Sequence, residues 1–139
     1  MKKLSGLSII FPAFNDSLSL PEIISKTSKL LPGLATRFEI IIVNDGSLDK
    51  TQSVLENLQN YFPFITIIKH KKNLGYGASL LDGFKKAKYD YLFYTDSDGQ
   101  YDVLELKESI KAMDSKTEMV TGFKVNRSDS LIRRFIGSL

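Results

Sequence analysis

The alternation of short apolar runs with amphipathic segments of helical period constrains the fold of this chain more than any other feature. Apolar runs of strand length span residues 7–11, 38–43, 64–68 and 89–95, with a fifth candidate at 119–123. Helical segments between them span residues 18–31, 50–60, 75–88 and 103–113. Continuous apolar strands separated by amphipathic helices are typical of a mostly parallel sheet covered on both faces. The sequence therefore predicts an α/β fold, a three-layer sandwich around a mostly parallel sheet.

The same pattern predicts how the elements end and which side chains face the core. Pro32 and Gly33 are expected to end the first helix, and Asp49 or Ser47 to cap the second. The aromatic run at 89–95 is expected to be a buried strand. The third helix is expected to turn four apolar side chains inward, those of Leu80, Leu81, Phe84 and Ala87.

Bulk properties exclude several classes of protein. A chain of 139 residues is expected to form one domain, residues 1–139. It contains no cysteine, which excludes a disulfide framework and a thiolate zinc site. No apolar run approaches the roughly 20 residues of a membrane span, and a net charge of +3 does not demand a nucleic-acid partner. We therefore expect a cytoplasmic domain without nucleic acid, peripheral at most at the inner face of the membrane.

The single histidine limits the chemistry further. With His70 alone, neither a histidine-based zinc site nor a Ser-His-Asp triad can form. The basic segment 69–72 is expected to be an exposed strand exit, and His70 is assigned no functional role.

Two carboxylates one residue apart, Asp96 and Asp98, follow the fourth apolar run. Ligands of open α/β sheets bind at the carboxyl ends of the strands, and two acids so close repel each other unless a cation lies between them. Mg2+ uses one or two carboxylates and completes its shell with water and substrate phosphates, and Gln100 offers an amide oxygen nearby. The alternative is a plain turn with Gly99 at positive φ. The preceding strand and the neighbouring loops favour a Mg2+ or Mn2+ site for a nucleotide diphosphate.

Other polar loops are expected at the same edge of the sheet. Residues 12–16 are suited to line a base or ribose pocket, or they form an ordinary loop in which Asp16 or Ser17 caps the helix. Asp45 is suited to accept hydrogen bonds from a nucleobase, although a helix cap with a turn glycine explains this loop locally. The Gly-rich helix start at 73–78 is suited to bind an anion. The alternative interpretation is a simple turn into the helix.

Basic residues gather in the last segment, 122–134. Arginine forks and lysine ammonium groups suit phosphate oxygens. A solvated helix surface is the alternative interpretation of the same residues.

Taken together, these segments resemble family 2 glycosyltransferases of the GT-A fold, and within them the polyprenyl- and dolichyl-phosphate sugar transferases. The matching stretches are SIIFPAFND at 8–16, IIVNDGSLD at 41–49, NLGYGA at 73–78 with Gly83 and Ala87, DSDGQ at 96–100, and residues 122–134. They are similar to the family's VIPAYNE, VDDGSxD, NxGxGxA, DxDxQ and GxRxxRxdsxxRR motifs. The set, in this order, is specific, and the match runs from about residue 5 to the end.

The resemblance implies a role for each matching position. Asp96 and Asp98 would hold the metal, with Gln100 assisting. The nucleotide would lie against Pro12, Ala13, Asp16, Asp45, Gly75, Asp96 and Lys124. The catalytic residues would be Asp98, Arg127 and Arg134, with both arginines and Lys124 facing the diphosphate or the acceptor phosphate. The implied activity is metal-dependent, inverting transfer of a hexose from a UDP- or GDP-sugar to a polyprenyl phosphate.

The chain departs from the family pattern in several ways. Asp16 stands where the family has Glu, Asn44 where it has Asp, and Lys124 where many members have Arg, so that a bidentate grip on phosphate is lost. Members of the group usually continue well past this length. We therefore expect the N-terminal part of a GT-A catalytic domain, truncated at the C-terminus. We also expect the apolar surface that such a truncation exposes to drive formation of a homodimer.

Other functions remain alternatives at this point. A truncated or inactive module would bind the nucleotide sugar without transferring it. A sugar nucleotidylyltransferase uses a similar sheet but needs a Gly-rich N-terminal loop with an arginine, where this chain has residues 12–16. A response-regulator-like domain has the same layers but no need of the loop at 96–100.

Overall fold

A computed structural model describes residues 3–99 and 102–122 of the chain. In this part, a sheet has the strand order β3-β2-β1-β4, and all its neighbouring strands are parallel. The strands are β1 (Leu7–Ala13), β2 (Phe38–Asn44), β3 (Ile65–Lys69) and β4 (Tyr91–Tyr94). The predicted parallel α/β fold is confirmed.

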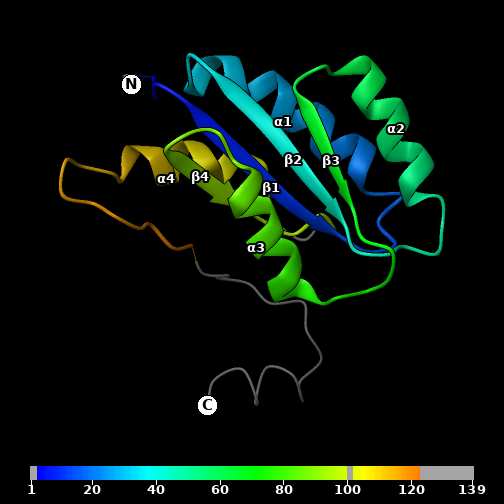
Figure 1. Ribbon diagram of the computed structural model, residues 1–139. Coiled ribbons are helices and arrows are strands. Elements are labelled where there is room, and N and C mark those ends of the chain that lie inside the picture. The colour runs from blue at the N-terminus through cyan, green and yellow to red at the C-terminus, as the bar shows by residue number, and fades with distance from the viewer. Residues whose placement is uncertain (1–2, 100–101, 123–139) are drawn as a thin grey trace, which may run out of the picture.

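Helices cover both faces of the sheet (Figure 1). The helices α1 (Leu20–Leu34), α2 (Thr51–Tyr61) and α4 (Leu106–Lys111), with the short 3-10 turn η1 (Val103–Glu105), pack on one face, and α3 (Tyr76–Lys86) packs on the other. Because side chains alternate along a strand, Ile9 and Phe11 of β1 enter the larger core, whereas Ile10 packs with Phe84 of α3. The predicted three-layer sandwich is therefore confirmed.

Helix α1 ends later than predicted. It runs through Pro32 to Leu34, so the expected stop at Pro32 and Gly33 is wrong. Pro32 cannot donate the hydrogen bond that the carbonyl of Ser28 would accept. The last turn is nevertheless held by tertiary contacts, because Leu34 is buried and its carbonyl accepts a hydrogen bond from the Leu4 N–H at 2.9 Å.

Strand β4 differs from its prediction in length and burial. It is shorter than 89–95 and pairs with β1 alone among the described strands, at one edge of the sheet. Tyr91, Leu92 and Tyr94 are consequently exposed, and the prediction of a buried strand is wrong. Phe93 alone of its four residues packs against the larger core.

Two expectations about apolar residues are also wrong. Leu81 of α3 is 51% exposed, and the buried residues of this helix are Ser79 and Gly83. Residues 119–122 form no strand, and Met119 is exposed; Phe123 lies outside the described residues. Within 3–99 and 102–122, no helix is long and apolar enough to cross a membrane.

Candidate functional site

The carboxyl ends of β1, β2 and β4 meet the start of α3 around one cavity. Its volume of about 620 Å³ is typical of small-molecule sites. Its lining comprises Pro12, Ala13, Phe14, Asp16, Asp45, Asn73, Gly75, Tyr76, Ser79, Asp96, Ser97 and Asp98. The structure thus brings together the predicted residues Pro12, Ala13, Asp16, Asp45, Gly75, Asp96 and Asp98. The other predicted residues, Gln100, Lys124, Arg127 and Arg134, lie outside the described residues.

The loop after β1 is tied to the loop after β2. The Asp45 N–H donates to the carbonyl of Ala13 at 2.9 Å. Asn15 donates its N–H to Ser47 Oγ at 3.0 Å and accepts the Leu48 N–H on its side-chain oxygen at 2.9 Å. Asn15 has a φ of 55°, a conformation that asparagine tolerates better than most residues. Both loops therefore form one hydrogen-bonded wall of the cavity.

Asp16 stabilises this wall rather than capping α1. Its carboxylate accepts the Phe14 N–H at 3.0 Å and contacts the Ser97 hydroxyl. The N-cap of α1 is Ser19, without a side-chain capping bond, so the alternative with Asp16 or Ser17 as a side-chain cap is wrong.

The acidic loop after β4 is anchored through its middle residue. Ser97 is buried, and its hydroxyl lies 2.8 Å from the carbonyl oxygen of Pro12. The Ser19 hydroxyl donates to the Ser97 carbonyl. With Ser97 held inward, its neighbours Asp96 and Asp98 both line the cavity. Gly99 has a φ of 80°, the positive value that the alternative interpretation as a turn expects. Ser97 has no role among the predictions from the sequence, although its place between two acids was the available signal.

The donor atoms of this loop suit a hard divalent cation that a ligand helps to hold. In the described part of the chain, no three His, Cys, Asp or Glu side chains gather closely enough to hold a metal. A cation at Asp96 and Asp98 would have to take its remaining ligands from water and a bound phosphate, as Mg2+ commonly does. The residues present therefore fit Mg2+ or Mn2+ in the company of a phosphate ligand.

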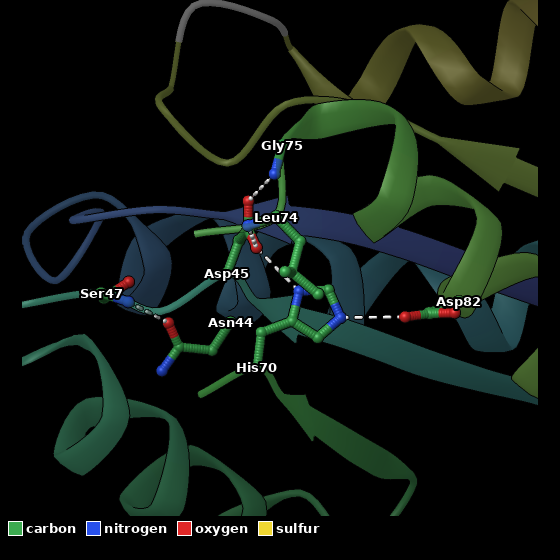
Figure 2. Close-up of polar contacts among 7 residues, drawn as sticks. All are labelled: Asn44, Asp45, Ser47, His70, Leu74, Gly75 and Asp82. Carbon is green, nitrogen blue, oxygen red and sulfur yellow. Dashed lines mark hydrogen bonds and ion pairs between the residues drawn. The ribbon is translucent and has the colours of Figure 1, made fainter. Parts of the chain in front are cut away.

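Asp45 lies at the end of β2 and joins the segment that leads into α3 (Figure 2). Its carboxylate accepts the N–H groups of Leu74 and Gly75 at 2.8 and 2.9 Å, and contacts His70 Nδ1 at 2.7 Å. Burial raises the pKa of Asp45, but the hydrogen bonds from Leu74, His70 and Gly75 outweigh it and hold this pKa below its ordinary value. A carboxylate has roughly four acceptor positions, so these three donors leave little of Asp45 for a ligand.

His70, like Ser97, has a structural role that the sequence did not predict. It is 8% exposed, so the expectation of an exposed strand exit is wrong at this position. Its Nε2 lies 3.0 Å from Asp82 Oδ2 of α3. The hydrogen bond to Asp45, opposed by burial and supported by Asp82, raises the pKa of His70. Strand alternation was the available signal, because residue 70 continues the row of Ile68, which faces the core under α3.

The rest of the β2 loop supports the start of α2. The side chain of Asn44 donates to Gln52 Oε1 at 2.7 Å and accepts the Ser47 N–H at 3.1 Å. Asp49 accepts the Thr51 N–H at 2.9 Å, whereas the Ser47 hydroxyl oxygen accepts the Asn15 N–H of the β1 loop. Hydrogen bonds from Thr51 lower the pKa of Asp49 to about 2. The N-cap of α2 is nevertheless Lys50, without a side-chain capping bond, so neither Asp49 nor Ser47 occupies the predicted cap position.

The start of α3 forms the remaining wall. Gly75 has a φ of 97°, a conformation that favours glycine. The first N–H groups of a helix have no partner inside it. Nearby, the hydroxyl of Ser79 is buried without a hydrogen-bond partner among the described residues. This wall thus offers polar groups that a ligand can satisfy.

Comparison with known proteins agrees with this geometry. The sequence matches the family Glycosyl transferase family 2 over residues 8–137. An undecaprenyl-phosphate 4-deoxy-4-formamido-L-arabinose transferase of Pseudomonas savastanoi pv. phaseolicola is 31% identical over 131 residues, which cover 93% of this chain and 39% of that protein. The protein of the same name from Proteus mirabilis is 28% identical over 134 residues, 96% of this chain and 41% of its own length. The chain thus spans about 40% of the length of these relatives.

Solved structures show the same fold. TarS of S. aureus, residues 1–349, has a TM-score of 0.64 and 25% identity, over 76% of this chain and 31% of that one. It is also known in complex with UDP-GlcNAc. The mannosyltransferase PcManGT from Pyrobaculum calidifontis, in complex with GDP-Man and Mn2+, has a TM-score of 0.62 over 76% of this chain and 31% of its own, and its 18% identity shows the fold alone. Because the family match covers nearly the whole chain, the protein belongs to glycosyl transferase family 2.

Proposed function

We propose that this chain carries the donor site of a glycosyltransferase that moves a sugar, expected to be a hexose, from a UDP- or GDP-sugar to a polyprenyl phosphate. The observation that carries the proposal is the cavity, in which motif residues from three strand ends and from the start of α3 meet. The undecaprenyl-phosphate transferases among the relatives support a lipid phosphate as the acceptor. The complex of TarS with UDP-GlcNAc supports a UDP-sugar as one donor.

In this proposal, Pro12, Ala13 and Asp16 hold the nucleoside, and Asp45 adds a contact through the acceptor position that His70, Leu74 and Gly75 leave open. Phe14, which is 43% exposed at the cavity wall, offers a ring surface for the base. Gly75 lets the backbone come close to the ligand at the positive end of α3, where an anionic group is favoured.

Asp96 and Asp98 would hold Mg2+ or Mn2+ beside the diphosphate. When bound, the cation offsets the negative charge that builds up on the departing nucleoside diphosphate. Gln100, Lys124, Arg127 and Arg134 remain predicted contributors that lie outside the described residues.

The acceptor chemistry explains why no strong base is needed. A phosphate monoester is largely doubly ionised near neutral pH, since its second pKa is about 6. One of its oxygens can attack the anomeric carbon as the bond from that carbon to the diphosphate breaks, with inversion and release of the nucleoside diphosphate. Catalysis then depends mainly on holding the two reactants in line.

Calorimetric titration with UDP- and GDP-sugars, with and without Mn2+, tests the donor site. We expect Mn2+ to tighten binding by about tenfold or more, equivalent to ~1.4 kcal/mol, and Asp98→Asn to lose this gain. Asp90→Asn is the matched control, because it makes the same change at an exposed carboxylate outside the cavity. Equal binding by Asp98→Asn would contradict the metal site, and no binding of any nucleotide sugar would contradict the function.

Transfer is tested separately with a radiolabelled sugar donor and a polyprenyl phosphate. Labelled lipid is the expected product, and the donor set should include a pentose as well as hexoses. Binding without transfer would instead support the alternative of a nucleotide-sugar-binding module.

A homodimer remains a prediction, which light scattering tests.

A further inference from the structure

His70 directly follows β3 and links the end of β2 to α3 (Figure 2). Its ring lies between Asp45 at the end of β2 and Asp82 on α3, with nitrogen-to-oxygen distances of 2.7 and 3.0 Å. Its backbone N–H donates to the carbonyl of Asn44 at 2.9 Å. The side chains of His70 and Asp45 are each 6% exposed, so water can replace the contact between them only poorly, whereas the side chain of Asp82 is 41% exposed.

The two contacts require the doubly protonated ring. Ionised carboxylates only accept hydrogen bonds, and a neutral imidazole has a single N–H. A neutral His70 would therefore turn a lone pair toward one of the two carboxylates. The charged groups that act on the ring are these two acids, Asp45 from β2 and Asp82 from α3, and both favour the imidazolium.

The same cluster fixes the wall of the cavity. The other bonds of Asp45 hold the N–H groups of Leu74 and Gly75, which lead directly into α3. The backbone of Gly46 also lies so close to this segment that a Cβ there would collide with the carbonyl carbon of Lys72. Loss of the His70 proton would weaken the tie between β2 and α3, and with it the placement of the wall residues Gly75 and Ser79.

We infer that His70 is a positioning residue for the nucleotide sugar, and that it acts as an imidazolium that ties α3 to the end of β2. This inference rests on the proposed function and deepens it, because it makes donor affinity depend on the protonation of a residue that does not line the cavity. Affinity is highest while His70 is charged, and it falls as the pH rises through the pKa of His70 in the folded protein.

The single histidine makes the test direct. In protein without a histidine tag, the one imidazole Cε1–H signal in the NMR spectrum reports the charge of His70 between pH 5 and pH 9. Calorimetry over the same pH values measures the affinity for a UDP- or GDP-sugar at constant Mn2+. A nucleotide sugar is the right probe, because its diphosphate lacks the terminal ionisation near pH 6 that free UDP or GDP has.

Asp82→Asn is the informative variant, with Asp90→Asn as its matched control. Removing the Asp82 charge is expected to lower the pKa of His70 and to shift the pH at which affinity falls by the same amount. At neutral pH the variant should bind about tenfold more weakly, the equivalent of one lost hydrogen bond. At pH values where its His70 is again protonated, its affinity should return toward that of the wild type, which simple structural damage would not allow.

The outcomes separate the two proposals. If the NMR midpoint moves in Asp82→Asn but the affinity midpoint stays, or if the wild type binds equally well at every pH, the role of His70 is overturned while the proposed function stands. If no nucleotide sugar binds at any pH, the proposed function fails, and the role of His70 in it fails as well.

Discussion

The polar side chains around the cavity differ in whether the protein already uses their hydrogen-bonding groups. The carboxylate of Asp45 accepts three donors from its own chain, and the hydroxyl of Ser97 bonds to the β1 loop. The hydroxyl of Ser79, in contrast, is buried without a partner in the described part of the chain. A buried polar group without a partner costs free energy. Ser79 is therefore the lining residue whose hydroxyl has most to gain from a bound ligand.

Replacing Ser79 by alanine tests this idea at the level of one atom. Because the hydroxyl bonds to nothing described in the free protein, Ser79→Ala should leave the free energy of unfolding unchanged or slightly raise it. Affinity for the nucleotide sugar should fall by about three- to tenfold, the value of one neutral hydrogen bond. Urea unfolding measures the free energy of unfolding, and calorimetry measures the affinity for the nucleotide sugar. Ser97→Ala is the contrasting control, which should lose about 1–2 kcal/mol of stability; unchanged affinity in Ser79→Ala would contradict a contact with the ligand.

Among the elements, α3 links the core to the cavity. Its first residues line the cavity, and its middle packs on β1 so closely that a Cβ on Gly83 would lie 2.5 Å from Ile10 Cγ2. Glycine at this position is therefore needed for close approach of helix and sheet. A change there should disturb both the core and the placement of the cavity wall.

Gly83→Ala is expected to destabilise the protein. The added methyl group must push Ile10 or α3 aside, which costs about 1–3 kcal/mol, more than the gain of roughly 0.5–1 kcal/mol from replacing a helical glycine over most of that range. Gly33→Ala in α1 is the matched control: its Cβ would meet nothing within 4 Å, so it should stabilise by about 0.4–1 kcal/mol. Urea unfolding measures both changes. If Gly83→Ala stabilised the protein as Gly33→Ala is expected to do, α3 would not pack against β1 this closely.

At the scale of the whole molecule, the sequence predicts the layers and the shared edge, but not the contacts between distant segments. Apolar runs that alternate with helical segments imply parallel strands, and parallel strands bring Asp45 and Asp96 to one edge. The edge position of β4 depends on strand order, which no local pattern encodes. The path of α1 through Pro32 depends on the burial of Leu34, and the pairing of His70 depends on two carboxylates, 25 and 12 positions away.

The pH dependence of global stability follows from the same cluster. The pKa of His70 is raised in the folded protein, so its contribution is complete below the ordinary value of 6.5 and is lost as pH rises through the raised pKa. The pKa of Asp45 is lowered, so its contribution is present above the ordinary value of 3.8 and is lost as pH falls through the lowered pKa. The free energy of unfolding should therefore be highest between these two ordinary values and decline on either side.

Urea unfolding between pH 3 and pH 9 measures this profile. At pH 6, Asp82→Asn should have a lower free energy of unfolding than the wild type. This difference should shrink at higher pH, as the wild-type His70 loses its proton, because a neutral ring gains little from a charged Asp82 over an amide. Asp90→Asn should follow the wild-type curve throughout. A difference between Asp82→Asn and the wild type that stays constant from pH 6 to pH 9 would mean that His70 is not charged in the folded protein, and that its two carboxylate contacts are made in some other protonation state.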